Sequence, residues 1–195
     1  MTRVRLIACV LWLCLTATAW AASPLEYTRA TLEQARAIVS SDQNHNDKLA
    51  ALSVLFTKFL DTDAMGRAAL GKHWSSFTTQ QQKEFLVLFR RLFQRTYVQE
   101  LLLFDKPRFA YVGETRLNGE AIVNTKIITP RDEFSVVYQL RPEGERWQVI
   151  RITVEDVSLT ANLGSQLDDL LSRDSVEDVL NLMNRKYGSN GGGGA

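Results

Sequence analysis

The sequence predicts an α+β fold, with N-terminal helices packed on a strongly twisted, four-stranded antiparallel sheet and a further helix at the C-terminal end. Two patterns predict it. Apolar residues recur every three to four positions in the first half of the chain, as in amphipathic helices, and alternate with polar ones between residues 109 and 154, as in half-buried strands. Helices followed by an antiparallel meander are typical of an α+β domain, in which the helices cover one sheet face.

The first 21 residues predict a cleavable signal peptide. Arg3 and Arg5 form a short positive segment, residues 6–15 an apolar run, and Ala19-Trp20-Ala21 a small-residue cleavage site. The segment is too short to span a hydrocarbon core of about 30 Å and also be anchored on both sides. We therefore expect the mature domain to be exported.

The composition of the expected mature domain, residues 22–188, limits its chemistry. Both cysteines, Cys9 and Cys14, lie in the signal peptide, so the mature domain would have no disulfide, thiol nucleophile or thiolate metal site. Removal of the signal peptide leaves 21 of the 23 Lys and Arg residues against 22 Asp and Glu residues, a net charge of −1. This balance argues against nucleic acid as a partner. Residues 189–195 are glycine-rich and predict a flexible tail.

Four helices are expected before the sheet. The first spans about residues 24–40, and a polar break separates it from a second helix with one apolar stripe. Residues 61–63 supply capping side chains for a short third helix. Thr78 and Gln81 form a capping box that begins a long fourth helix, which ends at about Phe104.

Alternating apolar residues then predict the four strands. The first ends at Asn118-Gly119, a dipeptide typical of a two-residue hairpin turn. The second and third strands carry alternating apolar side chains over residues 121–127 and 134–140. In the fourth strand the alternation changes phase after Val149, which indicates a β-bulge. The last helix is expected over residues 175–187.

The sequence contains no set of residues typical of an enzyme. His45 and His73 have no second metal ligand three or four residues away, and no nucleophile elbow, phosphate-binding loop or dinucleotide fingerprint occurs. We therefore expect no catalytic residue, no metal and no cofactor. Two alternatives remain open: a small-molecule enzyme with an ionisable group on the inner sheet face, and an interaction or chaperone-like protein whose apolar face binds peptides.

An excess of apolar residues is the most informative feature. Thirteen of the twenty residues between Phe85 and Phe104 are apolar, whereas a helix with one buried face needs only about three in seven. Such a helix is either buried in the core on several sides or forms one wall of an apolar cavity, with the sheet as the other wall. Periodicity alone does not separate these two interpretations.

Two blocks of sequence carry a recognisable pattern. The first begins with Leu70-Gly71-Lys72-His73-Trp74, continues with residues 78–85 (TTQQQKEF), and ends with Phe89 and Tyr97. The second is residues 147–159 (WQVIRITVEDVSL), followed by Asn162 and Ser165-Gln166. In order and spacing, the two blocks resemble the MlaC-like family, the toluene-tolerance periplasmic auxiliary proteins of lipid ABC transporters. The resemblance covers nearly all of the expected mature chain.

The resemblance implies a soluble, NTF2-like phospholipid shuttle, whose cavity takes acyl chains while the head group stays near the mouth. It also implies a periplasmic location, with an outer-membrane lipoprotein complex and an inner-membrane ABC transporter complex containing an MCE-domain protein as partners. Such a carrier performs no bond chemistry, and we expect a monomer. The chain departs from the family pattern at Arg151, Asp156, Leu163, Gly164 and Leu167.

Aromatic and aliphatic side chains of the fourth helix and of the inner sheet face are the predicted lipid-binding residues. They are Phe85, Phe89, Phe93, Tyr97, Phe109, Tyr111, Val123, Ile127, Val136, Tyr138, Trp147 and Val149.

Overall fold

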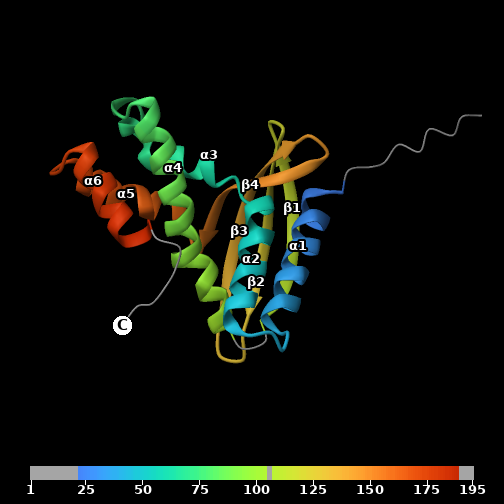
Figure 1. Ribbon diagram of the computed structural model, residues 1–195. Helices are drawn as coiled ribbons and strands as arrows, with labels where there is room; N and C mark the ends of the chain where they lie inside the picture. Colours follow the sequence, from blue (N-terminus) through green and yellow to red (C-terminus); the bar gives the residue numbers. More distant parts are fainter. Residues whose placement is uncertain (1–21, 105–106, 189–195) are drawn as a thin grey trace, which may run out of the picture.

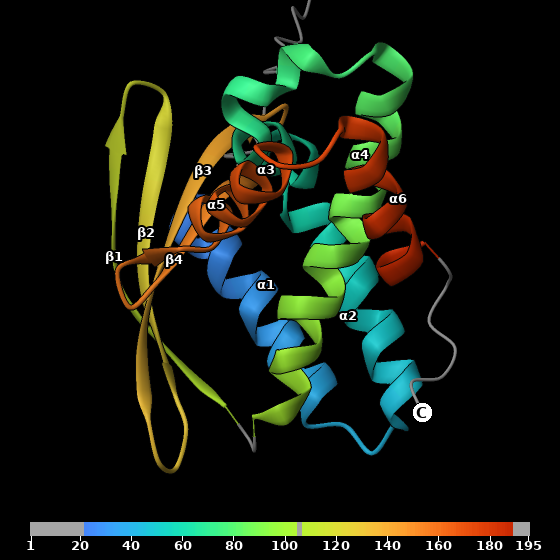
Figure 2. The same cartoon turned by 90° about the vertical axis from the view of Figure 1, so that its left-hand side faces the viewer.

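The computed structural model describes residues 22–104 and 107–188, which form a sheet with helices on one of its faces (Figure 1). The opposite face of the sheet, on the left in Figure 2, carries none of the described helices. The expected signal peptide, residues 1–21, and the expected tail, residues 189–195, lie outside the described residues. Among the helices that are described, none is both long enough and apolar enough to span a membrane.

The first three helices lie where the sequence predicts them. They are α1 (Pro24–Val39), α2 (His45–Phe59) and α3 (Thr62–Leu70). Each begins after a residue whose side chain accepts a hydrogen bond from the backbone N–H three positions later: Ser23, Asn44 and Asp61, respectively. Such caps satisfy backbone donors that have no partner within the helix, so they fix where each helix begins.

The long fourth helix is present, but its geometry changes along its length. After the short 3₁₀ helix η1 (Gly71–Ser76), the capping box of Thr78 and Gln81 begins α4 (Thr79–Phe93) as predicted. The chain then continues as a π-helical turn, η2 (Gln94–Val98), and a 3₁₀ helix, η3 (Gln99–Leu103). Turns of π-helix inside longer helices are frequent at functional sites.

The sheet has five strands, so the predicted count of four is wrong. The strands are β1 (Arg108–Leu117), β2 (Glu120–Ile128), β3 (Glu133–Glu143), β4 (Arg146–Val154) and β5 (Val157–Ser158). They follow one another in chain order, and each pairs antiparallel with the next. The fifth strand has only two residues, too few to show the alternation by which strands are found in a sequence.

Turn and bulge positions agree with the sequence pattern. Asn118 and Gly119 both have positive φ angles, as a tight hairpin turn requires. In the pairing of β3 with β4, Gln139 lies opposite Arg151 and Leu140 opposite Val149, so Ile150 is an extra residue. This is the β-bulge predicted from the change of phase in the fourth strand.

Two helices, not one, follow the sheet, and the second of them is the predicted last helix. They are α5 (Leu159–Leu171) and α6 (Val176–Tyr187), capped by Ser158 and Ser175. A Cβ atom on Gly164 of α5 would lie 2.9 Å from the carbonyl oxygen of Ala69 in α3. The glycine therefore allows the two helix backbones to approach closely.

Candidate functional site

An apolar cavity of about 340 Å³ lies between the helices and the inner face of the sheet. Residues of α1, α2, the η2–η3 segment, the last residue of α4 and the first residue of α5 form its helical side, and residues of β1 to β4 form its sheet side. The apolar part of its lining consists of Leu32, Ala35, Val39, Phe56, Leu60, Phe93, Tyr97, Val98, Leu101, Phe104, Pro107, Phe109, Ile127, Phe134, Val136, Tyr138, Ile152, Val154 and Leu159.

The register of the strands explains the sheet side of the cavity. Ile127 of β2 pairs with both Phe109 of β1 and Phe134 of β3, which places the three side chains in one row across the sheet. Side chains two residues apart on a strand share a face. Val136 and Tyr138 of β3 therefore lie on the same face as this row.

Partners on β4 extend this surface, because Val136 pairs with Val154 and Tyr138 with Ile152. All of these residues line the cavity. The sheet side of the cavity is therefore a continuous apolar surface over four strands.

A series of aromatic rings follows the long helix from the core to the cavity. Phe77, Phe85, Phe89, Phe93 and Tyr97 form successive ring contacts, with centroids 4.8–6.3 Å apart. Phe85 and Phe89 are fully buried within the protein core, whereas Phe93 and Tyr97 line the cavity. The first part of the apolar helix is therefore buried in the core, and its last part forms a wall of the cavity.

The structure divides the twelve predicted binding residues equally. Six of them line the cavity: Phe93, Tyr97, Phe109, Ile127, Val136 and Tyr138. Phe85, Phe89, Val123 and Val149 are fully buried in the core, outside the cavity lining. Tyr111 and Trp147 make polar contacts elsewhere, the former with Glu33 and the latter with the carbonyl group of Ala22.

Several residues that line the cavity are missing from the predicted binding residues, although the sequence pattern contains a signal for them. Leu32, Ala35 and Val39 form the apolar stripe of the first helix, and Phe134 lies in the alternating pattern of the third strand. The packing of α1 against the sheet decides which apolar residues of α1 reach the cavity. The helical period of the sequence does not reveal this packing.

The polar groups near the cavity are neutral or lie at its edge. Burial raises the pKa of the Tyr138 hydroxyl, and it raises that of Tyr97 as well, so both side chains stay uncharged at neutral pH. The charged residues in the lining are Arg36 and Glu100. Among the residues that the structure describes, no group of three or more His, Cys, Asp or Glu side chains could hold a metal ion.

A second set of charged residues lies away from the cavity, where η1 meets α5. The carboxylate oxygen Oδ1 of Asp168 lies 2.8 Å from Lys72 Nζ and 2.6 Å from His73 Nε2. The hydrogen bonds to Lys72 and then to His73 hold the pKa of Asp168 below its usual value. The contacts of Asp168 are thus those of a surface ion-pair cluster that joins two helices.

The fold and the cavity together define a class: α+β proteins with an apolar space between the helices and one face of an antiparallel sheet. The family model described as MlaC protein matches residues 26–185. The chain therefore belongs to the MlaC family, as the two sequence blocks indicated.

A solved structure has the same fold. The phospholipid-binding protein from Ralstonia solanacearum, solved in complex with a phospholipid, superposes with a TM-score of 0.76. The alignment covers 86% of this chain and 98% of that chain, with 17% sequence identity. At this level of identity the likeness concerns the fold. Among curated proteins, none matches the chain.

Proposed function

We propose that this protein is a periplasmic phospholipid shuttle, which carries lipid between an outer-membrane lipoprotein complex and an inner-membrane ABC transporter complex with an MCE-domain protein. The observation that carries the proposal is the apolar cavity between the helices and the sheet. The protein performs no bond chemistry in this role and acts as a monomer. Membership of the MlaC family and the phospholipid bound to the Ralstonia solanacearum protein support the proposal.

The energetics of lipid transfer explain why such a cavity is needed. Exposure of apolar surface to water costs about 0.8 kcal/mol per methylene group, so a sixteen-carbon chain costs on the order of 12 kcal/mol. This cost makes unaided passage of a phospholipid through an aqueous compartment very slow. A carrier must replace the lost apolar contacts and release the lipid again without chemical change.

The volume of the cavity suits one acyl chain. An apolar cavity of about 150 Å³ binds benzene, which has six carbon atoms. By this proportion the 340 Å³ cavity accommodates about 14 carbon atoms. The cavity in this conformation therefore matches the greater part of one acyl chain of a phospholipid.

The proposal is tested by identifying what the protein carries. The full chain is expressed with export, purified without detergent, and analysed by native mass spectrometry and by organic extraction. A cavity-free periplasmic protein of similar size, purified in parallel, serves as the control. We expect bound phospholipid in near-stoichiometric amount only in the first sample. The bare polypeptide mass in repeated preparations, or a co-purified peptide in place of lipid, contradicts the proposal.

A further inference from the structure

Two charged side chains interrupt the apolar lining of the cavity within the described residues, Arg36 of α1 and Glu100 of η3. The Arg36 side chain is 49% exposed, although the same residue lines the cavity. A side chain that contacts both the cavity and solvent marks the place where the cavity opens. Arg36 therefore lies at the mouth.

Arg36 is held in position by a chain of hydrogen bonds that begins on the sheet. The Tyr111 hydroxyl of β1 donates to Glu33 Oε1 at 3.0 Å, and Arg36 Nε donates to Glu33 Oε2 at 2.7 Å. Both oxygens of the Glu33 carboxylate are thus engaged, which orients the guanidinium group. Within residues 22–104 and 107–188, the Arg36 side chain makes no hydrogen bond other than the one to Glu33. Its two terminal NH₂ groups are therefore available to a ligand.

A second cation lies at the same edge. Lys48 Nζ donates a 2.8 Å hydrogen bond to the carbonyl oxygen of Val39, one turn after Arg36 in α1, and Val39 also lines the cavity. Arg36 and Lys48 contribute two positive charges near the mouth, and Glu33 and Glu100 contribute two negative ones. Glu33 is already bound to Arg36 and Tyr111. The attraction for an anion therefore comes from the terminal side of the Arg36 guanidinium group and not from a net positive charge.

We infer that Arg36 is the head-group anchor of the cavity, binding the phosphate of a phospholipid whose acyl chain occupies the apolar space. This inference rests on the proposed function. Guanidinium groups bind phosphate oxygens through two parallel hydrogen bonds, which gives orientation as well as affinity. Glu33 and Tyr111 act as positioning residues, because they fix the Nε side of the guanidinium and leave its terminal side for the ligand.

The test compares two lipids that differ only in the phosphate head group. Delipidated full-length protein is mixed with equal amounts of a phosphatidylglycerol and of the diacylglycerol with the same acyl chains, and native mass spectrometry measures the ratio of the complexes. We expect the wild type to prefer the phospholipid. Arg36→Gln should lower this preference about tenfold, the lower end for a hydrogen bond to a charged group. Arg36→Lys should lower it less, because the charge remains while the paired geometry is lost.

Arg67→Gln is the matched control. Arg67 is also an exposed arginine on a helix, α3, but it lies outside the cavity lining, and its guanidinium group lies over the Trp74 ring, 5.6 Å from the ring centroid. We expect it to keep the lipid preference of the wild type. Equal melting temperatures of the variants exclude a general loss of folding.

The outcomes separate this inference from the proposed function. Wild-type protein that binds neither lipid contradicts the proposed function. Protein that binds both lipids, with the same ratio in Arg36→Gln as in the wild type, contradicts only the role of Arg36. A third arm uses glycerol phosphate, which has the phosphate but no acyl chain. If it binds as tightly as the phospholipid, the site is one for free phosphate and the inference fails.

Discussion

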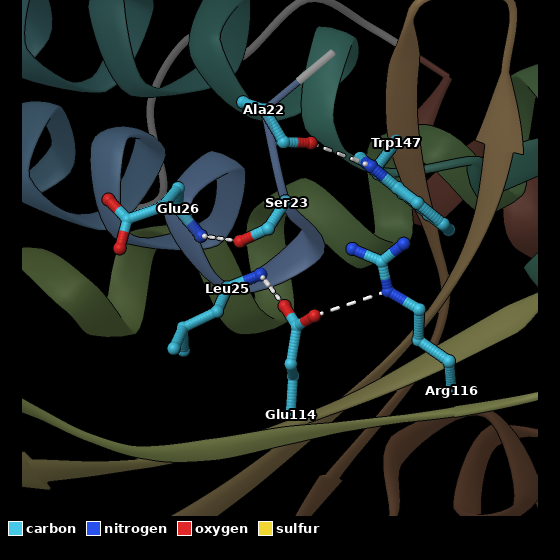
Figure 3. A network of polar contacts seen from close by, with 7 residues as sticks. All are labelled: Ala22, Ser23, Leu25, Glu26, Glu114, Arg116 and Trp147. Atoms are coloured by element: carbon cyan, nitrogen blue, oxygen red, sulfur yellow. Dashed lines mark hydrogen bonds and ion pairs between the residues drawn. The ribbon is translucent and has the colours of Figure 1, made fainter. Parts of the chain in front are cut away.

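The backbone N–H of Leu25 donates a 2.8 Å hydrogen bond to Glu114 Oε2, which joins the start of α1 to the middle of β1 (Figure 3). The other carboxylate oxygen of Glu114 lies 3.2 Å from Arg116 Nε, and Trp147 Nε1 donates a 3.1 Å hydrogen bond to the carbonyl oxygen of Ala22. A negative charge at a helix N-terminus interacts favourably with the helix dipole. Glu114 therefore holds α1, one wall of the cavity, against the sheet.

Replacement of Glu114 should loosen this end of α1. We expect Glu114→Ala to lower the free energy of unfolding by about 1 kcal/mol, the usual effect of losing a side chain that caps a helix. Chemical denaturation measures it. Glu143→Ala removes an exposed glutamate of the same sheet and should change stability by less than about 0.5 kcal/mol. Equal effects of the two substitutions would show that the Leu25–Glu114 bond is not stabilising.

The sequence was sufficient to predict one face of the sheet. A period of two assigns Ile127, Val136 and Tyr138 to the inner face, and all three line the cavity. The same reasoning placed Val123 and Val149 on that face, and there they are fully buried in the core. The two-residue period of a strand tells which sheet face a side chain is on. It does not tell whether a helix or an empty space lies opposite that side chain.

The fourth helix shows the same limit. Phe85 and Phe93 lie on one apolar stripe, two turns apart, yet the first is enclosed by core and the second faces the cavity. The difference comes from α3, which packs on the first part of α4: Gly66 of α3 places its backbone close to the Phe89 ring. Such contacts between distant segments are set by the whole packing arrangement, so a single sequence does not reveal them.

Two residues in the turn between β4 and β5 have a backbone conformation that is unfavourable for L-amino acids. Glu155 and Asp156 both have positive φ, 47° and 64°, in a two-residue turn for which glycine is favoured. The left-handed region costs roughly 1–2 kcal/mol for most L-residues and less for Asp, while glycine costs about 0.5–1 kcal/mol in chain entropy. For Asp156→Gly the relief of strain and the entropy cost of glycine nearly cancel, so we expect the stability to change by less than about 0.5 kcal/mol. We expect Asp156→Ala to destabilise the protein by about 1 kcal/mol. A higher melting temperature for Asp156→Ala than for Asp156→Gly would show that the backbone is not strained at this position.

The Asp168 cluster gives a prediction for pH. The pKa of Asp168 is lowered in the folded protein by Lys72 and then His73, relative to an ordinary value of 3.8. Its contribution to stability is therefore present above pH 3.8 and is lost as the pH falls through the lower pKa of the folded state. A titration followed by NMR at the Asp168 carboxyl carbon should show this low pKa, and Lys72→Gln should raise it. An unchanged pKa in that variant would mean that Lys72 does not contact Asp168 in solution.

The close approach of α3 and α5 depends on Gly164. In an open helix, Gly→Ala gains about 1 kcal/mol. Here the new methyl group would meet the Ala69 carbonyl oxygen at 2.9 Å, and backbone atoms do not move aside easily. Overpacking costs about 1–3 kcal/mol, so we expect Gly164→Ala to destabilise the protein overall. Ser165→Ala, at the exposed neighbouring position, should have little effect. A more stable Gly164→Ala protein would show that the two helices separate readily.

The strongest test of the cavity compares two valines on the inner face of the sheet. Val136 of β3 lines the cavity, whereas Val123 of the adjacent strand β2 lies outside the cavity lining and is fully buried. The two positions share residue type, sheet face and burial. They differ in whether empty space or close-packed protein lies above them, so a large side chain should have opposite effects at the two sites.

We expect Val136→Trp to fill space that a lipid chain would otherwise occupy. The lipid-free protein should keep its stability, while the amount of bound lipid falls sharply. Val123→Trp is overpacking and should cost about 1–3 kcal/mol, with bound lipid per folded molecule unchanged. Denaturant melts of delipidated protein, paired with lipid quantification on the native form, measure both quantities. A destabilised Val136→Trp protein that still carries lipid at the normal ratio would remove Val136 from the binding surface, and the acyl chain would then have to lie nearer the helical wall of Phe93 and Tyr97.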